Sequence, residues 1–241
     1  MRACGWIVAL VAVLSVCAQA AELDWSAVDY APAGGTLATF NNVDGTTVDM
    51  TFQWSGSTDN FLTNWGSPPI SLPDDDPAAS QFGMSALWYA VNFNDANDSI
   101  SLVITFSETV TGVRFALYDI DGVSPIFENT RIKGFLDTVA MLPDEFGCGS
   151  DVAVQILPIG TLPVSGVVFS NLGQYDTNPP NDAHWAYVVF DGPLNKIGMQ
   201  YKCSTGLERG QLIGNVTFIP EPGTLLVLSL GGLLGLRRKR A

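Results

Sequence analysis

The sequence predicts one exported all-β domain, an antiparallel β-sandwich or jelly roll. Three observations support this prediction. Apolar residues recur with a period of two rather than 3.6, clusters of turn-forming residues are dense, and helix caps and helical periodicity are nearly absent. Many short strands joined by such turns are typical of sandwiches and jelly rolls.

Strands with one buried face are predicted wherever apolar and polar residues alternate. In the clearest case Ile100, Leu102, Ile104 and Phe106 alternate with more polar neighbours. The segments with this pattern are Val48–Phe52, Ile100–Phe106, Val113–Leu117, Val152–Ile156, Ile197–Tyr201 and Leu212–Ile219. The more continuous apolar runs Val164–Phe169 and Trp185–Phe190 predict central strands buried on both faces.

Turns are predicted between these strands, because Gly, Pro, Asn and Asp favour the backbone conformations that reverse a chain. The turn segments are Asn42–Gly45, Ser67–Pro69, Pro73–Pro77, Asn94–Asp98, Asp121–Gly122, Asn178–Pro180 and Asp191–Pro193.

The N-terminus has the layout of a secretory signal peptide. Met1-Arg2 precedes an apolar run from Trp6 to Val16, and the small-residue site Ala18-Gln19-Ala20 follows. We expect cleavage after Ala20, so residues 1–20 form a removable leader.

The C-terminus carries a short apolar run. Thr224–Leu236 has thirteen residues, or roughly 20 Å of helix, whereas a bilayer core is about 30 Å thick. Pro220 and Pro222 would interrupt any extension of the run. A lasting anchor is therefore disfavoured, although a plain single-span anchor remains the alternative. The basic residues that follow should stay cytoplasmic and leave the domain outside.

The order of parts in this tail resembles the PEP-CTERM sorting signal of Gram-negative bacteria. The parts are Pro220, Glu221 and Pro222, the apolar stretch Gly223–Leu236, and the basic end Arg237, Arg238, Lys239 and Arg240. The resemblance implies export, transient insertion in the inner membrane, and handling by exosortase in bacteria that make exopolysaccharide. The run Phe106–Phe115 leading into Tyr118–Gly122 is also similar to extracellular bacterial β-sandwich modules, which implies no assigned activity.

The chain therefore divides into a leader (1–20), an extracellular domain (21–219) and a sorting tail (220–241). About 200 residues suffice for one domain with a proper core. Residues 21–220 hold 23 acidic and 6 basic side chains, a net charge of −17. Such a surface repels phosphates, so nucleic acid is excluded as a partner.

Two cysteines, Cys148 and Cys203, remain after the leader is removed. An even pair in an exported protein predicts one disulfide. Free thiols or a metal-binding pair are the alternatives.

Catalytic patterns are missing from the sequence. There is no Gly-x-Ser-x-Gly elbow, no His-Glu-x-x-His and no Cys-x-x-Cys pair, which are the signals of serine hydrolases and zinc sites. The single histidine, His184, is expected in a turn or at the surface. We therefore expect a protein that is not an enzyme.

Asp119 and Asp121 form the best carboxylate pair. Neighbours on one strand do not flank a scissile glycosidic bond, but two carboxylates followed by Gly122 suit Ca²⁺. A strand-ending turn without an ion is the alternative. No other cofactor is expected.

Trp65 and Tyr175 lie in polar segments and are candidates for stacking on sugar rings. Because aromatic side chains usually serve the core, a packing role is the alternative for each, and Trp88 and Trp185 in apolar stretches are expected to be core residues.

The sequence thus predicts an exported, non-catalytic protein of the cell surface or the exopolysaccharide matrix, handled by exosortase. The alternative hypothesis is a carbohydrate-binding, lectin-like module that uses Ca²⁺.

Overall fold

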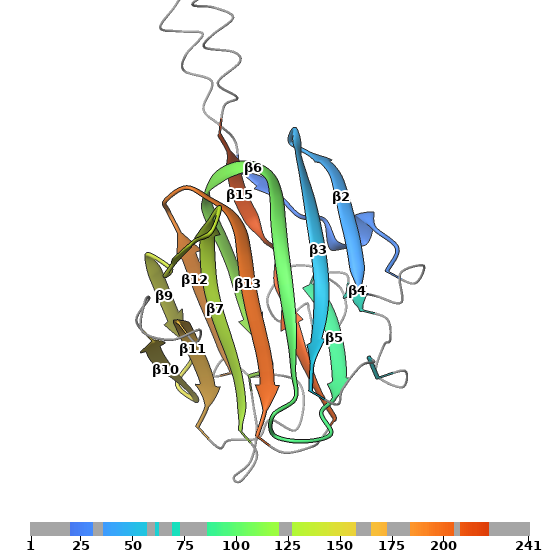
Figure 1. Cartoon of the computed structure of the whole chain (residues 1–241), viewed down its shortest axis with the longest axis vertical. Helices are drawn as coiled ribbons and strands as arrows, with labels where there is room; N and C mark the ends of the chain where they lie inside the picture. The colour runs from blue at the N-terminus through green and yellow to red at the C-terminus, as the bar shows by residue number, and fades with distance from the viewer. Residues whose placement is uncertain are drawn as a thin grey trace, which may run out of the picture.

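The described part of the chain folds into two antiparallel sheets that pack face to face, which confirms the predicted all-β sandwich (Figure 1). The computed structural model describes residues 20–30, 36–56, 61–62, 69–72, 86–120, 127–157, 165–172, 184–204 and 208–221. Every pairing between the described strands is antiparallel. Two such sheets bury their inner faces against each other and leave their outer faces to solvent.

The front sheet has the order β2-β3-β6-β13-β7-β11-β10. Its strands are β2 (Leu37–Val43), β3 (Thr46–Ser55), the first half of β6 (Ser99–Tyr118), β13 (Leu194–Cys203), β7 (Glu128–Leu136), β11 (Gly166–Asn171) and β10 (Val152–Leu157), with β8 (Val139–Met141) paired to the end of β7.

The back sheet has the order β4-β5-β14-β6-β12-β9, with β15 beside β6 and β1 beside β15. Its strands are β4 (Ile70–Leu72), β5 (Ala86–Asn92), β14 (Glu208–Ile213), the second half of β6, β12 (Trp185–Phe190), β9 (Glu145–Cys148), β15 (Thr217–Pro220) and β1 (Ala21–Glu22).

The long strand β6 belongs to both sheets. Its first half pairs with β3 and β13 in the front sheet, and its second half pairs with β12, β14 and β15 in the back sheet. The chain arches between the layers near Gly112, whose φ is +60° (Figure 1). The sequence predicts two strands here, Ile100–Phe106 and Val113–Leu117, whereas the structure has one continuous bent strand.

The predicted alternation is confirmed over most of the sandwich. Ile100, Leu102 and Ile104 are buried and Thr105 is exposed, because successive side chains of a strand point to opposite faces. Strand β10 differs: Val152 is buried, but Val154 and Ile156 are 37% and 51% exposed. The strand lies at the edge of the front sheet, where neighbouring strands cover it from one side only.

The apolar run of β12 also departs from its prediction. Strand β11 is buried on both faces, with Val167, Val168 and Phe169 all under 9% exposed, as expected for a central strand. On β12, in contrast, Trp185 and Tyr187 are half-buried on the outer face of the back sheet and stack on each other at 5.9 Å between ring centroids. Only the inner face of β12 enters the main core.

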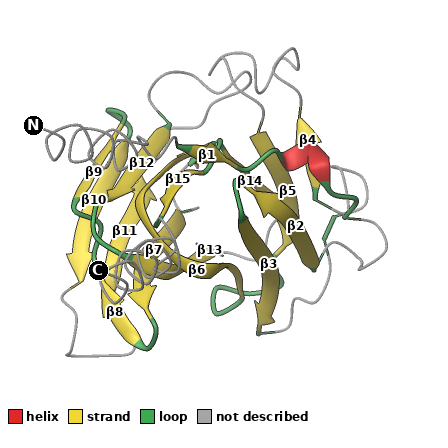
Figure 2. Cartoon of the chain, turned by 90° about the horizontal axis from the view of Figure 1, so that it is seen from above, coloured by secondary structure: helices red, strands yellow, loops and turns green. Residues whose placement is uncertain are grey.

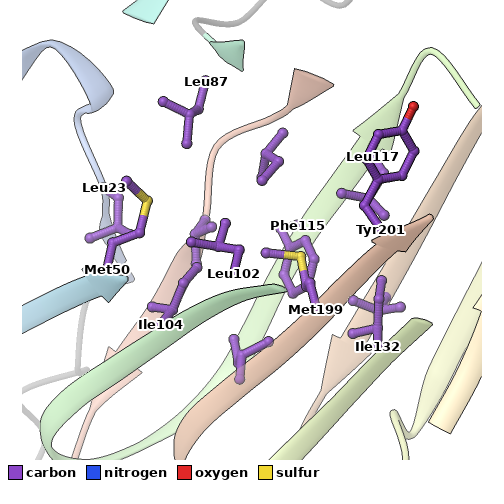
Figure 3. Packing of buried hydrophobic residues seen from close by; sticks show 14 of the residues in the cluster. Leu23, Met50, Leu87, Leu102, Ile104, Phe115, Leu117, Ile132, Met199 and Tyr201 are labelled. Carbon is purple, nitrogen blue, oxygen red and sulfur yellow. The ribbon is translucent and has the colours of Figure 1, made fainter. Parts of the chain in front are cut away.

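The core fills the space between the layers (Figure 3). Met50, Leu102, Ile104 and Met199 of the front sheet meet Phe115 and Leu117 of the back-sheet half of β6, and the set is labelled in the figure. At about 25 cal/mol per Å² of apolar surface removed from water, this burial is the main stabilising term.

Polar contacts also cross between the layers. Tyr89 of β5 donates to Gln211 of β14 at 2.6 Å, and Gln211 donates in turn to Thr130 of β7 at 2.6 Å. The Nε of Arg209 on β14 lies 3.0 Å from a carboxylate oxygen of Glu128 on β7. Because buried polar groups demand fixed partners, these contacts set how β7 lies over β14 and therefore fix the position of the front sheet.

The two ends of the domain meet. Ala21 on β1 pairs with Phe218 on β15, and Leu23 donates its N–H to the carbonyl of Val216 at 3.0 Å. After β1 the chain forms a 3-10 turn, η1 (Trp25–Ala27), capped by Asp24, which lies beside β4 (Figure 2). The residues after the predicted cleavage site thus close the back sheet.

The predicted disulfide between Cys148 and Cys203 is wrong: neither cysteine is in a disulfide. Cys203 ends β13, whereas the Cys148 thiol donates to the carbonyl of Val152 at 3.1 Å, at the start of β10. Strands β13 and β10 are three steps apart in the sheet, or roughly 14 Å. A disulfide requires Cα atoms within about 7 Å.

None of the described segments forms a helix with the length and apolar content that a membrane crossing requires. Residues 1–19 of the predicted signal peptide (1–20), together with Pro222 and the tail beyond it, lie outside the described residues.

Candidate functional site

A groove of about 420 Å³ crosses the outer face of the front sheet. It spans β3, β6, β13 and β7, the central strands of that sheet, and opens away from the core. The residues that line the groove are Gln53, Ser101, Val103, Arg131, Lys133, Phe135, Lys196, Gly198, Met199 and Gln200. No carboxylate, histidine or cysteine is among them.

Strand period and register place these side chains together. On β7, Arg131, Lys133 and Phe135 are half-buried and alternate with buried inward residues such as Ile132. On β13, Lys196, Gly198 and Gln200 are likewise half-buried and alternate with buried inward residues. The register sets these two series opposite each other as the pairs Lys196↔Phe135, Gly198↔Lys133 and Gln200↔Arg131.

Planar polar groups form one row across the groove. Gln53, Ser101, Gln200 and Arg131 are successive register partners on β3, β6, β13 and β7. The Arg131 guanidinium donates to Gln200 Oε1 at 3.2 Å, and the Gln200 amide nitrogen donates to Ser99 Oγ at 3.1 Å. This chain of contacts orients both planar groups, which presents several donors in a fixed geometry.

Arg131 has unused donor capacity. Its Nε is buried and has no hydrogen-bond partner. The aliphatic stem packs against Gly166 of β11, where a Cβ would lie 2.9 Å from Arg131 Cγ, and the φ of +145° at Gly166 also favours glycine. Burial lowers the pKa of the Arg131 guanidinium, although an arginine stays charged.

Phe135 supplies the aromatic surface of the groove. The ammonium nitrogens of Lys133 and Lys196 lie 5.1 Å and 5.0 Å from its ring centroid, within the range of cation–π attraction. Across from the ring, Gly198 has no side chain, and a Cβ there would lie 3.4 Å from Phe135 Cε2. The ring edge therefore borders open space above β13.

The groove is electropositive in an acidic protein. Burial, and then the nearby charge of Arg131, lower the pKa of Lys133. A lowered pKa means that the folded protein disfavours the charged form of this lysine. With polar donors, an aromatic edge and three cations, the groove is equipped to bind a polar ligand.

Only one residue of the predicted calcium pair is described. Asp119 follows β6 with φ +65°, a turn conformation, and Asp121 lies outside the described residues. Within the described ranges, no three His, Cys, Asp or Glu side chains converge as a metal-binding group. Calcium at this turn stays a prediction.

The sequence predicts His184 in a turn or at the surface; it lies in a bend just before β12 and is buried. It is 2% exposed, with Nε2 3.5 Å from a carboxylate oxygen of Asp151, and its carbonyl accepts the N–H of Ile120, which follows the neighbouring strand β6. The two sugar-stacking candidates, Trp65 and Tyr175, lie outside the described residues.

The aromatic side chains on the outer face of the back sheet are packed onto it. Trp88 covers Gly210, where a Cβ would overlap the indole, and a Cβ at Gly147 would lie 2.5 Å from Tyr187 Cε1. Trp88 and Trp185 also pack against a small cluster of Tyr118, Leu212 and Ala86. Much of the surface of these rings is in contact with neighbouring residues of the protein itself, so the front groove is the better candidate site.

Sequence reasoning missed this groove. Arg131 and Lys133 are the only basic residues two apart in the exported domain, and this spacing on a strand places both on one face. That signal was available, but the register that adds Lys196 and Gln200 from β13 was not.

The fold and the groove define a β-sandwich with a polar, cationic groove on one outer face. No family model matches the chain, and no curated protein matches it. Among solved structures, the chain is similar to a family 11 carbohydrate-binding module from Clostridium thermocellum, in complex with a β-1,3-1,4-mixed-linked tetrasaccharide. That structure is 6% identical with a TM-score of 0.36, and the match covers 83% of this chain and 95% of that one.

A carbohydrate-binding module described for specific mannan recognition is also similar, at 12% identity and a TM-score of 0.35, covering 85% of this chain and 99% of that one. At these identities and TM-scores, the similarity assigns no ligand to this chain.

Proposed function

We propose that this protein is an exported, non-catalytic carbohydrate-binding protein that holds a saccharide chain in the groove of the front sheet. The observation that carries the proposal is the row of oriented planar groups, Gln53, Gln200 and Arg131, beside the ring of Phe135. Sugar hydroxyls are both donors and acceptors. An amide group offers them a donor and an acceptor, and a guanidinium offers them several donors. The apolar faces of sugar rings suit an aromatic neighbour.

The form of the groove favours a chain over a small metabolite. Small-molecule sites are usually deep and mostly apolar, whereas this groove runs over four strands on an open sheet face. A polymer can lie across such a face with several residues in contact. No carboxylate is among the lining residues, and glycosidases use a pair of them, which supports binding without hydrolysis.

The cellular location of the protein is also part of the proposal. The leader and the PEP-CTERM-like tail support export, exosortase processing and residence at the cell surface or in the exopolysaccharide matrix. Strand β15 ends at Pro220, and Glu221 is exposed. Pro220 pairs with Val110, and the Glu221 N–H donates to the Thr109 carbonyl at 3.3 Å. The motif therefore begins on the last described strand, with Glu221 at its exposed end.

A groove-filling substitution tests the binding proposal. Gly198→Phe places a ring over the floor of the groove, and its Cβ fits at ordinary contact distance from Phe135. The mature chain from Ala21 is screened on a glycan array with and without Ca²⁺, and the hits are measured by calorimetry. We expect Gly198→Phe to lose at least about tenfold in affinity, or about 1.4 kcal/mol.

The matched control is Gln155→Phe, which adds the same ring to an exposed position of the edge strand β10, on the outer face of the same sheet. This variant should bind like the wild type. The proposal is wrong if no glycan binds, or if the two phenylalanine variants bind equally well. A loss of binding with chelator would support the calcium prediction at Asp119.

A further inference from the structure

Half of the basic residues of the exported domain gather in the groove. Residues 21–220 contain six, and Arg131, Lys133 and Lys196 line this one site. Register places the three on adjacent strands β7 and β13, on the same outer face. In a domain with 23 acidic side chains, such a concentration of positive charge stands out against the surrounding surface.

The three cations have no acidic partner among the described residues. The described arginines that do form ion pairs lie elsewhere: Arg114 pairs with Asp191 at 4.0 Å, and Arg209 with Glu128 at 3.0 Å. In the groove, Arg131 contacts an amide, and the two lysines contact only the ring of Phe135 among charged or aromatic groups.

An uncompensated cluster of like charges opposes folding, because each charge disfavours the charged form of its neighbours. The lowered pKa of Lys133, caused by burial and by Arg131, reports that cost. Perturbed groups of this kind gather at functional sites. A ligand anion in the groove would offset the repulsion between these cations.

We propose that the groove selects an acidic saccharide, in which Arg131 binds a carboxylate or sulfate on the sugar and Lys133 and Lys196, both beside Phe135, add positive charge farther along the groove. This inference rests on the proposed carbohydrate binding and names the class of sugar. Arginine matches such anions because its planar fork donates two parallel hydrogen bonds.

The rest of the surface limits which anions can bind. With a net charge of −17 over the exported residues, the domain repels a dense polyanion such as nucleic acid. A polysaccharide in which charged sugars are separated by neutral ones can place its charge in the groove and keep neutral residues against the acidic surroundings.

Matched pairs of ligands test the inference. Oligogalacturonate is compared with its methyl ester, and a sulfated dextran oligosaccharide with the unsulfated form, by calorimetry on the mature chain at constant ionic strength. We expect the charged member of at least one pair to bind roughly tenfold more tightly, since charge-assisted hydrogen bonds are about twice as strong as neutral ones. The two pairs distinguish carboxylate from sulfate.

A charge-neutral variant assigns the effect to the groove. Lys133→Gln combined with Lys196→Gln should reduce the preference for the charged ligand over its neutral partner to less than about threefold, because the ionic contacts are lost. Lys202→Gln is the control: this lysine lies on the same face of β13 but does not line the groove. Melting temperatures of both variants should equal or exceed that of the wild type.

The outcomes separate the two proposals. Equal binding of charged and neutral ligands overturns the acidic-saccharide inference and leaves carbohydrate binding in place. A preference for charge that survives in the double variant also overturns it. If no saccharide binds at all, the proposed function fails together with the inference.

Discussion

The protonation state of Lys133 should affect the affinity of the groove for an acidic saccharide. Its pKa is lowered by burial and by Arg131, so it loses its proton at a lower pH than an ordinary lysine. Binding of an acidic saccharide should therefore weaken as pH rises through this lowered pKa. In Lys133→Arg, which stays charged, the alkaline loss should disappear.

The measurement is calorimetry from pH 7 upward with the charged ligand. The sign for folding is opposite to that for binding: a lysine with a lowered pKa costs stability at neutral pH, and the cost is relieved as pH rises. Identical pH profiles for the wild type and Lys133→Arg would contradict the assignment.

Position 56 requires glycine because the neighbouring Asp98 leaves no room for a Cβ. The φ of Gly56 is +94°, and a Cβ would overlap the Asp98 carboxylate and lie 2.9 Å from Asp98 Cα. That carboxylate is fully buried and accepts the N–H groups of Asn94 and Asp95 at 2.8 Å and 3.1 Å. Gly56→Ala should thus lower the free energy of unfolding by about 3 kcal/mol in urea denaturation.

Gly192→Ala is the control for Gly56→Ala. A Cβ at Gly192 meets no atom within 4 Å, so this variant should stay within about 0.5 kcal/mol of the wild type. Similar stabilities of the two variants would show that the contact with Asp98 does not constrain Gly56.

Strand β6 couples the two sheets, since its halves pair in different layers. The bend requires positive φ at Gly112, where a Cβ would also lie 3.2 Å from Ile219 Cδ1. Gly112→Val forces a β-branched residue into that conformation and should cost roughly 1–3 kcal/mol. Because one strand serves both layers, the amides of both halves should lose protection from hydrogen exchange together.

Hydrogen exchange of Ile100–Ile104 and Phe115–Leu117 checks this coupling. In Gly112→Val the protection of both segments should fall by the same amount. Loss confined to one segment would show that the sheets open independently.

The same strand shows what sequence patterns can and cannot predict. Alternation identified both halves of β6 and the strands β3 and β13, because burial of one face leaves a period of two in the sequence. The bend between the halves was not visible, because pairing of Val110 with Leu194 of β13 and with Pro220 of β15 holds this segment extended, and both partners are distant in sequence. Trp185 likewise looked like a core residue, because local hydrophobicity does not tell which face of β12 is covered.

For the molecule as a whole, the missing disulfide is testable. Burial raises the pKa of the Cys148 thiol, which slows its reaction near neutral pH. Iodoacetamide added to the mature chain after unfolding, without reductant, should label both cysteines, and reductant should leave the melting temperature unchanged. An unlabelled chain that becomes labelled only after reduction would restore the predicted bridge.

The site could be predicted only in its components. Period two places Arg131, Lys133 and Phe135 on one face, but their partners on β13 come from more than sixty residues away, through a register that contacts between the layers help to set. The disulfide prediction failed for the same reason. An even number of cysteines indicates that two thiols can pair, whereas the strand order places these two thiols too far apart.

Ala21 and Phe218 face each other on the back sheet, while the groove opens on the front. A tag or partner joined directly before Ala21 or directly after Phe218 would therefore start from the sheet opposite the groove. A chain attached to a surface through either of these points would present the groove away from that surface.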